Sequence, residues 1–248
     1  MISHDSVGCP LCGDDAPLFG VVDFNKCCVV QIPLSGIPVY YRKCGNCGFL
    51  FSDYFWDWSD SDFKTRIYND EYIKFDPEYD TVRPAQSAKL IMEVFSAHLR
   101  TLYFIDYGGG NGTCARLLRE SGVDADTCDI HSGVQTTGGR KADVVTAFEV
   151  MEHSNDPRKT LEDVIGNLND TGVILFSTLL LPDDFSAPNS IGMSWWYIAP
   201  RNGHISIYSR TSLELLFRHY GFSIRSFSGG LHIAYRTVPA FARHLIPA

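Results

Sequence analysis

The sequence feature that most constrains the fold is a glycine-rich turn at residues 104–113. An apolar run reaches Asp106, and four glycines follow it, namely Gly108, Gly109, Gly110 and Gly112. Glycine adopts the backbone conformations of a tight turn and lets the main chain approach a ligand closely, while the amides at the start of the next helix face the same place. This order of strand, glycine turn and helix predicts a ligand site beyond the carboxyl end of a strand in an open α/β sheet.

Strand and helix signals alternate after this turn. Predicted strands lie at residues 102–105, 127–128, 143–148, 172–177, 222–227 and 231–236, and predicted helices at residues 115–120, 160–168 and 211–220. Strands that alternate with helices are typical of a Rossmann-like, mostly parallel sheet with helices on both faces. The last two strands, close together in sequence, predict a closing hairpin.

The first part of the chain carries a different signature, two C-x-x-C pairs formed by Cys9, Cys12, Cys44 and Cys47. A two-residue gap lets both thiolates of one turn reach the same ion, and a glycine directly after each pair permits that turn. Two such pairs joined by short β-rich runs predict a structural, four-cysteine Zn²⁺ site in a zinc-ribbon-like module. The other cysteines lack paired spacing and are expected not to be ligands, namely Cys27, Cys28, Cys114 and Cys128.

These signals divide the chain into three expected parts. Residues 1–52 form the zinc-ribbon-like module, residues 53–100 a connector with a leading helix, and residues 101–248 the α/β domain. The helix is predicted from apolar residues that recur at three- and four-residue steps, namely Ala88, Ile91, Met92, Phe95 and Leu99.

Charge and hydropathy restrict the partners. The net charge is −8 and the sequence pI is about 5.4, which disfavours a nucleic-acid partner because phosphate backbones are anionic. No apolar run is long enough to cross a bilayer, and no secretory leader pattern is evident. We therefore expect a cytoplasmic protein without membrane contact, and the sequence gives no indication of its oligomeric state.

Three functions compete for the glycine turn. A phosphate-binding P-loop requires a lysine followed by serine or threonine after the last glycine, and neither is present. A dinucleotide fingerprint fits only in the frame Gly110-x-Gly112-x-x-Ala115, which starts two residues beyond the natural strand end. The pattern D-x-G-x-G-x-G from Asp106 to Gly112 fits without such a shift, and it is the first motif of class I methyltransferases.

Residues 102–248 resemble the class I, seven-stranded S-adenosylmethionine-dependent methyltransferases. Asp129 matches the acidic residue that holds the cofactor's ribose in that family, and residues 143–153 match its fourth strand with an E-x-x-E-H ending. The resemblance implies that S-adenosylmethionine is bound by Asp106, Gly108, Gly109, Gly110, Gly112, Asp129 and Phe148. The stretch between Asp129 and Asp143 is short, and it contains no residue that we can match to the family's acidic contact with the adenine. Asp124 and Asp126 are alternatives for the ribose contact.

The candidate catalytic residues are His153, His204 and Glu149. His153 follows the predicted fourth strand and could act as a general base oriented by Glu149 or Glu152. The residues Glu149, Glu152 and His153 could instead bind a divalent cation, as the same pattern does in some relatives, or serve only as caps. His204 ends a segment rich in aromatic residues, at 193–204, which is expected either to line the substrate or to form a structural plug.

The expected function is methyl transfer to a small molecule. An N-terminal zinc module before such a domain resembles a group of methyltransferases that modify sugars and secondary metabolites, which makes a sugar or related metabolite the favoured acceptor. RNA methylation with the zinc module as the docking element is one alternative, although residues 1–52 carry only three cations, Lys26, Arg42 and Lys43. An NAD-dependent oxidoreductase and a non-enzymatic binding module are the others.

Overall fold

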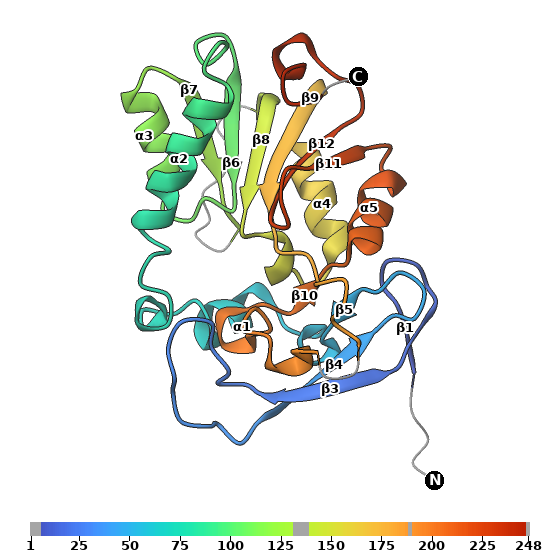
Figure 1. The fold of residues 1–248 in the computed structure, drawn as a ribbon. Helices are drawn as coiled ribbons and strands as arrows, with labels where there is room; N and C mark the ends of the chain where they lie inside the picture. Colours follow the sequence, from blue (N-terminus) through green and yellow to red (C-terminus); the bar gives the residue numbers. More distant parts are fainter. Residues whose placement is uncertain (1–5, 131–138, 188–189, 247–248) are drawn as a thin grey trace. The chain divides into compact units, whose positions relative to one another are not determined.

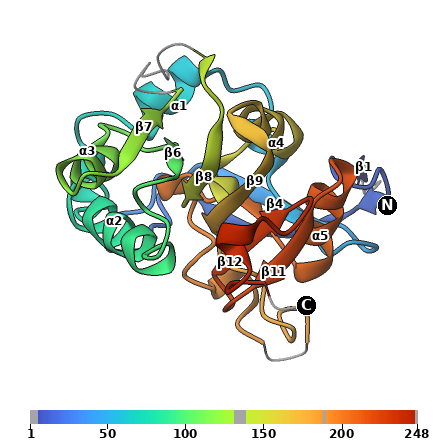
Figure 2. The ribbon, with the colours of Figure 1, turned by 90° about the horizontal axis from the view of Figure 1, so that it is seen from above.

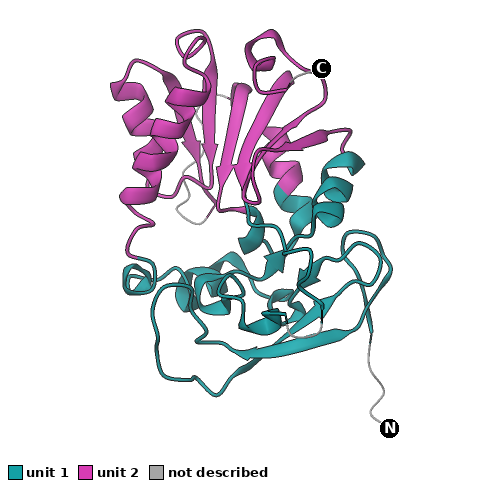
Figure 3. Cartoon of the chain, viewed as in Figure 1, with its two compact units in different colours: residues 1–76, 151–160, 178–219 teal, residues 77–150, 161–177, 220–248 magenta. Residues whose placement is uncertain are grey.

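The structure is a computed structural model that describes residues 6–130, 139–187 and 190–246. The chain folds into two compact units (Figure 3). Unit 1 comprises residues 1–76, 151–160 and 178–219, and unit 2 comprises residues 77–150, 161–177 and 220–248. Both units are therefore assembled from segments that are distant in sequence. The functional boundaries expected near residues 52 and 100 stay predictions.

Unit 2 is built on one sheet (Figure 1). Its strands are β6 (Tyr103–Tyr107), β7 (Asp124–Cys128), β8 (Ala142–Phe148), β9 (Leu168–Ser177), β11 (Ser223–Ser226) and β12 (Leu231–Tyr235). Their order is β11-β12-β9-β8-β6-β7. The four strands β7, β6, β8 and β9 are parallel, whereas β12 pairs antiparallel with β9 and with β11. The predicted α/β class, mostly parallel sheet and closing hairpin are confirmed.

In the described part of the chain this sheet has six strands, and the seventh strand expected from the resemblance is not among the described residues. Between β7 and β8 the described residues are 129–130 and 139–141. The remaining residues of that stretch lie outside the described ranges.

Burial explains why β6 forms the middle of the parallel part. All five residues of this strand are buried, as expected for a strand covered on both faces. The helices α2 (Val82–Val94) and α3 (Thr113–Glu120) pack on each other beside β6 and β7 (Figure 2). The predicted leading helix is confirmed: Ala88, Ile91 and Phe95 are buried in the core, and Met92 and Leu99 pack against it.

Unit 1 contains a four-stranded antiparallel sheet of order β10-β5-β4-β3 and a short ladder, β1-β2. The strands are β1 (Val7–Gly8), β2 (Asp15–Ala16), β3 (Leu18–Asp23), β4 (Pro38–Lys43), β5 (Leu50–Phe51) and β10 (Ser206–Ile207). Its helices are α1 (Asp60–Arg66) and α5 (Arg210–His219), while α4 (Pro157–Gly166) begins in this unit and ends in unit 2. Strand β10 comes from the C-terminal half of the chain, so that half supplies one strand of the sheet that the N-terminal residues build.

A membrane-spanning helix would need a long apolar stretch. None of the helices in the described ranges has the length and hydropathy to cross a bilayer.

Candidate functional site

The glycine turn in unit 2 leaves β6 and enters α3 through backbone conformations that suit glycine. Gly108, Gly110 and Gly112 have φ angles of 73°, 55° and 79°, in the left-handed region that is unfavourable for other residues. Gly109 has an ordinary φ, but a Cβ there would overlap the Oδ2 atom of Asp106 and come within 3.0 Å of Thr127 Cγ2. The turn is thus wrapped closely around these two side chains.

Asp106 is a buried carboxylate at the end of β6. It is 6% exposed and accepts a hydrogen bond of 2.8 Å from the Thr146 hydroxyl. The pKa of Asp106 is raised to about 6, because burial and the nearby carboxylate of Asp129 together outweigh the lowering effect of the hydrogen bonds from Thr146 and Cys114. A carboxylate held this way gains stability from a cation placed beside it.

Asp129 is the predicted acidic residue that lies at the glycine turn. Its Oδ2 atom accepts a hydrogen bond of 3.0 Å from the amide of Gly110. The two alternatives, Asp124 and Asp126, lie on β7 and bond to other residues. Asp124 pairs with Arg140 at 2.5 Å, and Asp126 accepts a hydrogen bond of 2.7 Å from the Tyr103 hydroxyl. The geometry therefore favours Asp129 over both as the residue next to a ligand in this turn.

Thr127 is a site residue that the sequence analysis missed. Its Oγ1 atom is buried and has no hydrogen-bond partner among the described residues. A Cβ on Gly112 would lie 3.3 Å from that atom, so the hydroxyl faces the glycine turn. Buried hydroxyls are usually satisfied, and an unsatisfied one at a turn suggests that a ligand completes it. The only sequence signal was its position two residues before Asp129.

The order of the sheet explains why these groups gather. The chain runs from β6 to β7 on one side and then to β8 on the other side of β6. Ligands of open α/β sheets bind where the strand order reverses in this way. Phe148 ends β8 at this point, and its side chain is partly buried.

Glu149 directly follows β8 and has an unusual backbone. Its φ of 53° is the only positive value found for a non-glycine residue in the described ranges, and such strain concentrates at functional sites. Ser177, at the end of β9, holds it on both sides: the Ser177 hydroxyl donates to Glu149 Oε1 at 2.7 Å and accepts from the Glu149 amide at 2.9 Å. The predicted catalytic residue Glu149 is thus fixed in unit 2.

The other two predicted catalytic residues meet in unit 1. The rings of His153 and His204 have centroids 4.9 Å apart in an edge-to-face arrangement. One ligand atom each from these histidines and from Glu152 all lie within 4.8 Å of one another. Glu152 is fully buried and His204 is 6% exposed. The structure therefore groups Glu152, not Glu149, with the histidines of its own unit.

Two tyrosines that the sequence analysis did not single out as catalytic hold this histidine pair. The Nδ1 atom of His204 donates to the carbonyl oxygen of Tyr197 at 2.9 Å, which leaves Nε2 of a neutral ring as the basic nitrogen. The Tyr197 hydroxyl donates to Glu152 Oε1 at 2.6 Å, and the Tyr68 hydroxyl lies 2.9 Å from His153 Nδ1. Tyr68 stands in the part expected as a connector, where no local motif marks it.

The aromatic segment before His204 is mostly buried. Trp195 and Tyr197 pack in the core of unit 1, and the Arg201 guanidinium lies over the Phe75 ring at 3.7 Å. Trp196 is the exception, with 52% of its surface exposed. These contacts match the structural plug that the sequence analysis considered, and the substrate-lining role stays a prediction.

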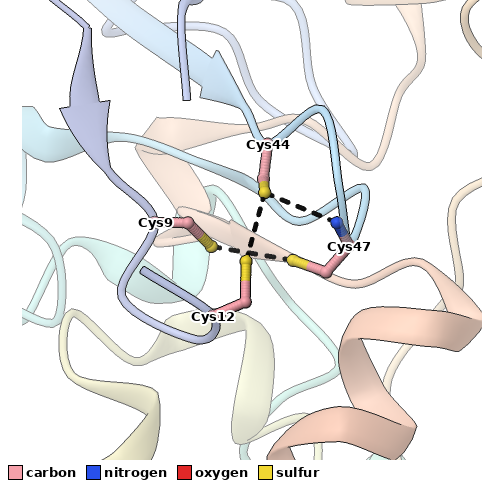
Figure 4. A group of neighbouring side chains, drawn as sticks. All are labelled: Cys9, Cys12, Cys44 and Cys47. Carbon is pink, nitrogen blue, oxygen red and sulfur yellow. Dashed lines mark hydrogen bonds between the residues drawn. The ribbon is translucent and has the colours of Figure 1, made fainter. Parts of the chain in front are cut away.

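The four paired cysteines come together in unit 1 with their sulfur atoms facing one another (Figure 4). The Sγ atoms of Cys9 and Cys47 are 3.6 Å apart and those of Cys12 and Cys44 are 3.4 Å apart. A tetrahedron of thiolates about 2.3 Å from a Zn²⁺ ion has sulfur–sulfur edges of about 3.8 Å. The hydrogen bond with Cys47 lowers the pKa of Cys9 to about 5, so one thiol of the group ionises readily.

Comparison with known proteins places the site in context. Residues 79–226, more than half of the chain, match the family described as methyltransferase domain. The sequence matches no curated protein.

Three solved structures illustrate the similarity. Magnesium protoporphyrin IX methyltransferase from Synechocystis PCC 6803 with bound SAH has 16% identity and a TM-score of 0.47, over 74% of this chain and 97% of that one. An O-methyltransferase family protein from Burkholderia thailandensis has 17% identity and a TM-score of 0.49, over 71% and 63%. The 1,6-didemethyltoxoflavin-N1-methyltransferase of the same organism, with 1,6-didemethyltoxoflavin and S-adenosylhomocysteine bound, has 15% identity and a TM-score of 0.48, over 72% and 87%. The matched family covers the strand, the glycine turn and the acidic residue that build the site in unit 2, and the chain belongs to this methyltransferase family.

Proposed function

We propose that the chain is an S-adenosylmethionine-dependent methyltransferase whose cofactor binds at the glycine turn of unit 2. The observation that carries the proposal is the close approach of this turn to two buried carboxylates, Asp106 and Asp129, at the point where the strand order reverses. When bound, S-adenosylmethionine supplies a methyl group activated by a sulfonium. The protein then has to bind, align and exclude water.

The residues present fit this cofactor. Asp129 would accept from the ribose hydroxyls, and the Thr127 hydroxyl, which faces the turn, offers a further polar contact. The ionised carboxylate of Asp106 would attract the cationic amino-acid end of the cofactor. A pyrophosphate, in contrast, would meet two carboxylates at this turn, which disfavours a dinucleotide on charge grounds.

Titration of the whole chain with S-adenosylhomocysteine and with NAD, followed by calorimetry, tests this proposal. We expect micromolar affinity for S-adenosylhomocysteine and none for NAD. Asp129→Asn should weaken S-adenosylhomocysteine binding by about tenfold, or about 1.4 kcal/mol. Asp126→Asn, on the strand β7 that ends just before Asp129, is the matched control and should have little effect. Binding of NAD alone would overturn the proposal.

The acceptor is proposed to be a small molecule, with a sugar or related metabolite as the favoured class. Methyl transfer to an O–H or N–H group releases a proton, and His153 or His204 could take it. The hydrogen bond from His204 Nδ1 to the Tyr197 carbonyl means that, in the neutral ring, Nε2 carries the lone pair, which supports His204 in this role. Glu149 stays a candidate beside the cofactor site.

A metal ion at the histidine cluster is a second candidate role, favoured by one observation. Glu152, His153 and His204 offer three ligand atoms within 4.8 Å of one another, and two histidines with one carboxylate are a common divalent-metal set. Elemental analysis of the wild type and of His204→Gln separates the two roles. A second bound ion in the wild type that is lost in His204→Gln supports metal ligation, whereas a single bound ion in each protein supports His204 as the general base.

The four cysteines are proposed to bind structural Zn²⁺. Their sulfur spacing fits a closed tetrathiolate site, in which no position remains for a substrate. The N-terminal segment would then serve as scaffold, not as catalyst.

A further inference from the structure

Each cysteine pair is hydrogen-bonded through its backbone carbonyls to a side chain that follows one of the two histidines in sequence. The first pair and its intervening residues, 9–12, are called knuckle 1, and residues 44–47 are called knuckle 2. The guanidinium of Arg158 donates from Nε to the Pro10 carbonyl at 3.0 Å and from Nη2 to the Leu11 carbonyl at 2.7 Å. Arg158 thus grips the two residues between the cysteines of knuckle 1, and it stands five residues after His153.

Ser209 makes the corresponding contact with knuckle 2. Its hydroxyl donates to the Cys47 carbonyl at 2.6 Å and accepts from the Ser212 amide at 3.0 Å, so it also caps α5. Gly48 permits this approach, because a Cβ there would lie 3.1 Å from Ser209 Oγ. Ser209 stands five residues after His204.

Knuckle 2 also supports His204 through the sheet of unit 1. It closes the hairpin of β4 and β5, and β10, which begins two residues after His204, pairs with β5. The hydroxyl of Tyr41, on β4, donates to the His204 carbonyl at 2.7 Å. The backbone of His204 is therefore held by the hairpin that the second cysteine pair closes.

The two histidine segments are in turn fastened to each other. The Ile205 amide donates to the Glu152 carbonyl at 2.9 Å, and the Ser206 hydroxyl donates to the Ser154 carbonyl at 2.6 Å. The Tyr208 hydroxyl adds a bond to the Met151 carbonyl at 3.1 Å. Contacts from both knuckles thus converge on the backbone around the histidine pair.

We propose that a metal ion in the cysteine cluster sets the spacing of His153 and His204, with Arg158 and Ser209 as the positioning residues that transmit it. A tetrathiolate ion fixes knuckle 1 to knuckle 2 through short metal–sulfur bonds, whereas the thiols alone make only weak S–H contacts. The inference rests on the proposed function, in which the cysteines bind metal and the histidines act on the acceptor. It gives the N-terminal segment a part in the reaction without contact to the reacting atoms.

Histidine NMR on the full chain tests this inference without a known acceptor. Imidazole signals of His153 and His204 are assigned with His153→Gln and His204→Gln, and their chemical shifts at one fixed pH are compared between the zinc-loaded protein, Arg158→Ala and Arg158→Lys. Arg218→Ala is the control, because Arg218 is an exposed arginine of the same unit that pairs only loosely with Glu214, at 3.9 Å. Ser209→Ala and Ser209→Thr repeat the test on knuckle 2.

We expect Arg158→Ala and Ser209→Ala to shift the imidazole signals of both histidines, with recovery in Arg158→Lys and Ser209→Thr. Affinity for S-adenosylhomocysteine, a property of unit 2, should stay within about twofold, and turnover with an acceptor should fall about tenfold, as for outer-shell groups of metal sites. Removal of the metal by a chelator should move the same two signals.

Unchanged signals in the alanine variants would overturn the inference, as would equal shifts in all eight histidines, which indicate general loosening. If an alanine variant does not fold, its conservative partner and the metal-removal arm decide the matter. Failure of the proposed function is a separate result: wild-type chain that binds no S-adenosylhomocysteine, or no metal at its cysteines.

Discussion

The Tyr197 hydroxyl donates a hydrogen bond of 2.6 Å to the carboxylate of Glu152, a side chain with no solvent exposure. The same hydroxyl oxygen accepts from the Leu179 amide at 3.1 Å. The Tyr197 hydroxyl thus bonds both to a buried carboxyl group and to a partly buried amide. Because the Tyr197 carbonyl also receives the His204 hydrogen bond, this residue supports the cluster through both its side chain and its backbone.

Tyr197→Phe should destabilise the protein by about 2 kcal/mol, because the deletion removes a donor to a buried carboxyl group and an acceptor for the partly buried Leu179 amide. Thermal unfolding by calorimetry measures the change. Tyr40→Phe is the matched control: Tyr40 is 45% exposed, on β4 of the same unit, and its change should stay within about 0.5 kcal/mol. Equal effects of the two substitutions would show that the buried hydroxyl contributes nothing special.

Gly109→Ala should abolish detectable binding of S-adenosylhomocysteine. The added methyl group would overlap Asp106 Oδ2 and lie within 3.0 Å of Thr127 Cγ2, and both are expected at the cofactor. Gly229→Ala serves as the control in unit 2, because a Cβ there meets no atom within 4 Å and its φ is not positive. Calorimetric titration compares the two, and full affinity in Gly109→Ala would contradict the proposed cradle.

The buried position of Asp106 predicts a pH-dependent stability. The folded pKa is about 6, above the ordinary 3.8, because burial disfavours the charge. The stabilising protonated form is therefore fully present below about pH 4, and its contribution of about 3 kcal/mol is lost as the pH rises to about 6. Asp106→Asn carries no such charge, so the variant should gain stability relative to the wild type between pH 4 and 7. Urea unfolding at several pH values checks this, and parallel curves for both proteins would refute it.

Cofactor affinity should follow the opposite course. An ionised Asp106 attracts the cationic end of S-adenosylhomocysteine, so wild-type binding should tighten as the pH rises through about 6. The Asp106→Asn variant should bind more weakly and lose this dependence. Calorimetric titration at pH 5, 6 and 7 would reveal it.

The conformation of the glycine turn and the clustering of the cysteine pairs could be predicted because each depends on a local sequence pattern. The residues of these patterns are recognised from their short separations along the chain, namely Gly108 to Gly112, Asp129 and the two C-x-x-C pairs. The partners of the histidines could not be predicted from the sequence, because they depend on tertiary packing. Tyr68 reaches His153 across 85 positions, and strand β10 joins β5 across more than 150. Glu149 and Glu152 are only three residues apart, yet Glu149 bonds to Ser177 in unit 2, whereas Glu152 joins the histidines of unit 1.

Cysteine substitution should separate ligands from bystanders. Cys12→Ser should abolish zinc binding at the cluster, because a serine hydroxyl does not ionise near neutral pH and cannot replace a thiolate. Cys27→Ser is the isosteric control in the same unit: the Cys27 thiol donates to the Phe75 carbonyl at 3.5 Å, a bond that a hydroxyl can keep. We expect about one zinc ion per wild-type chain and per Cys27→Ser chain by elemental analysis. Full zinc content in Cys12→Ser would place the metal elsewhere, and zinc loss in Cys27→Ser would mean that the fourth ligand had been misassigned.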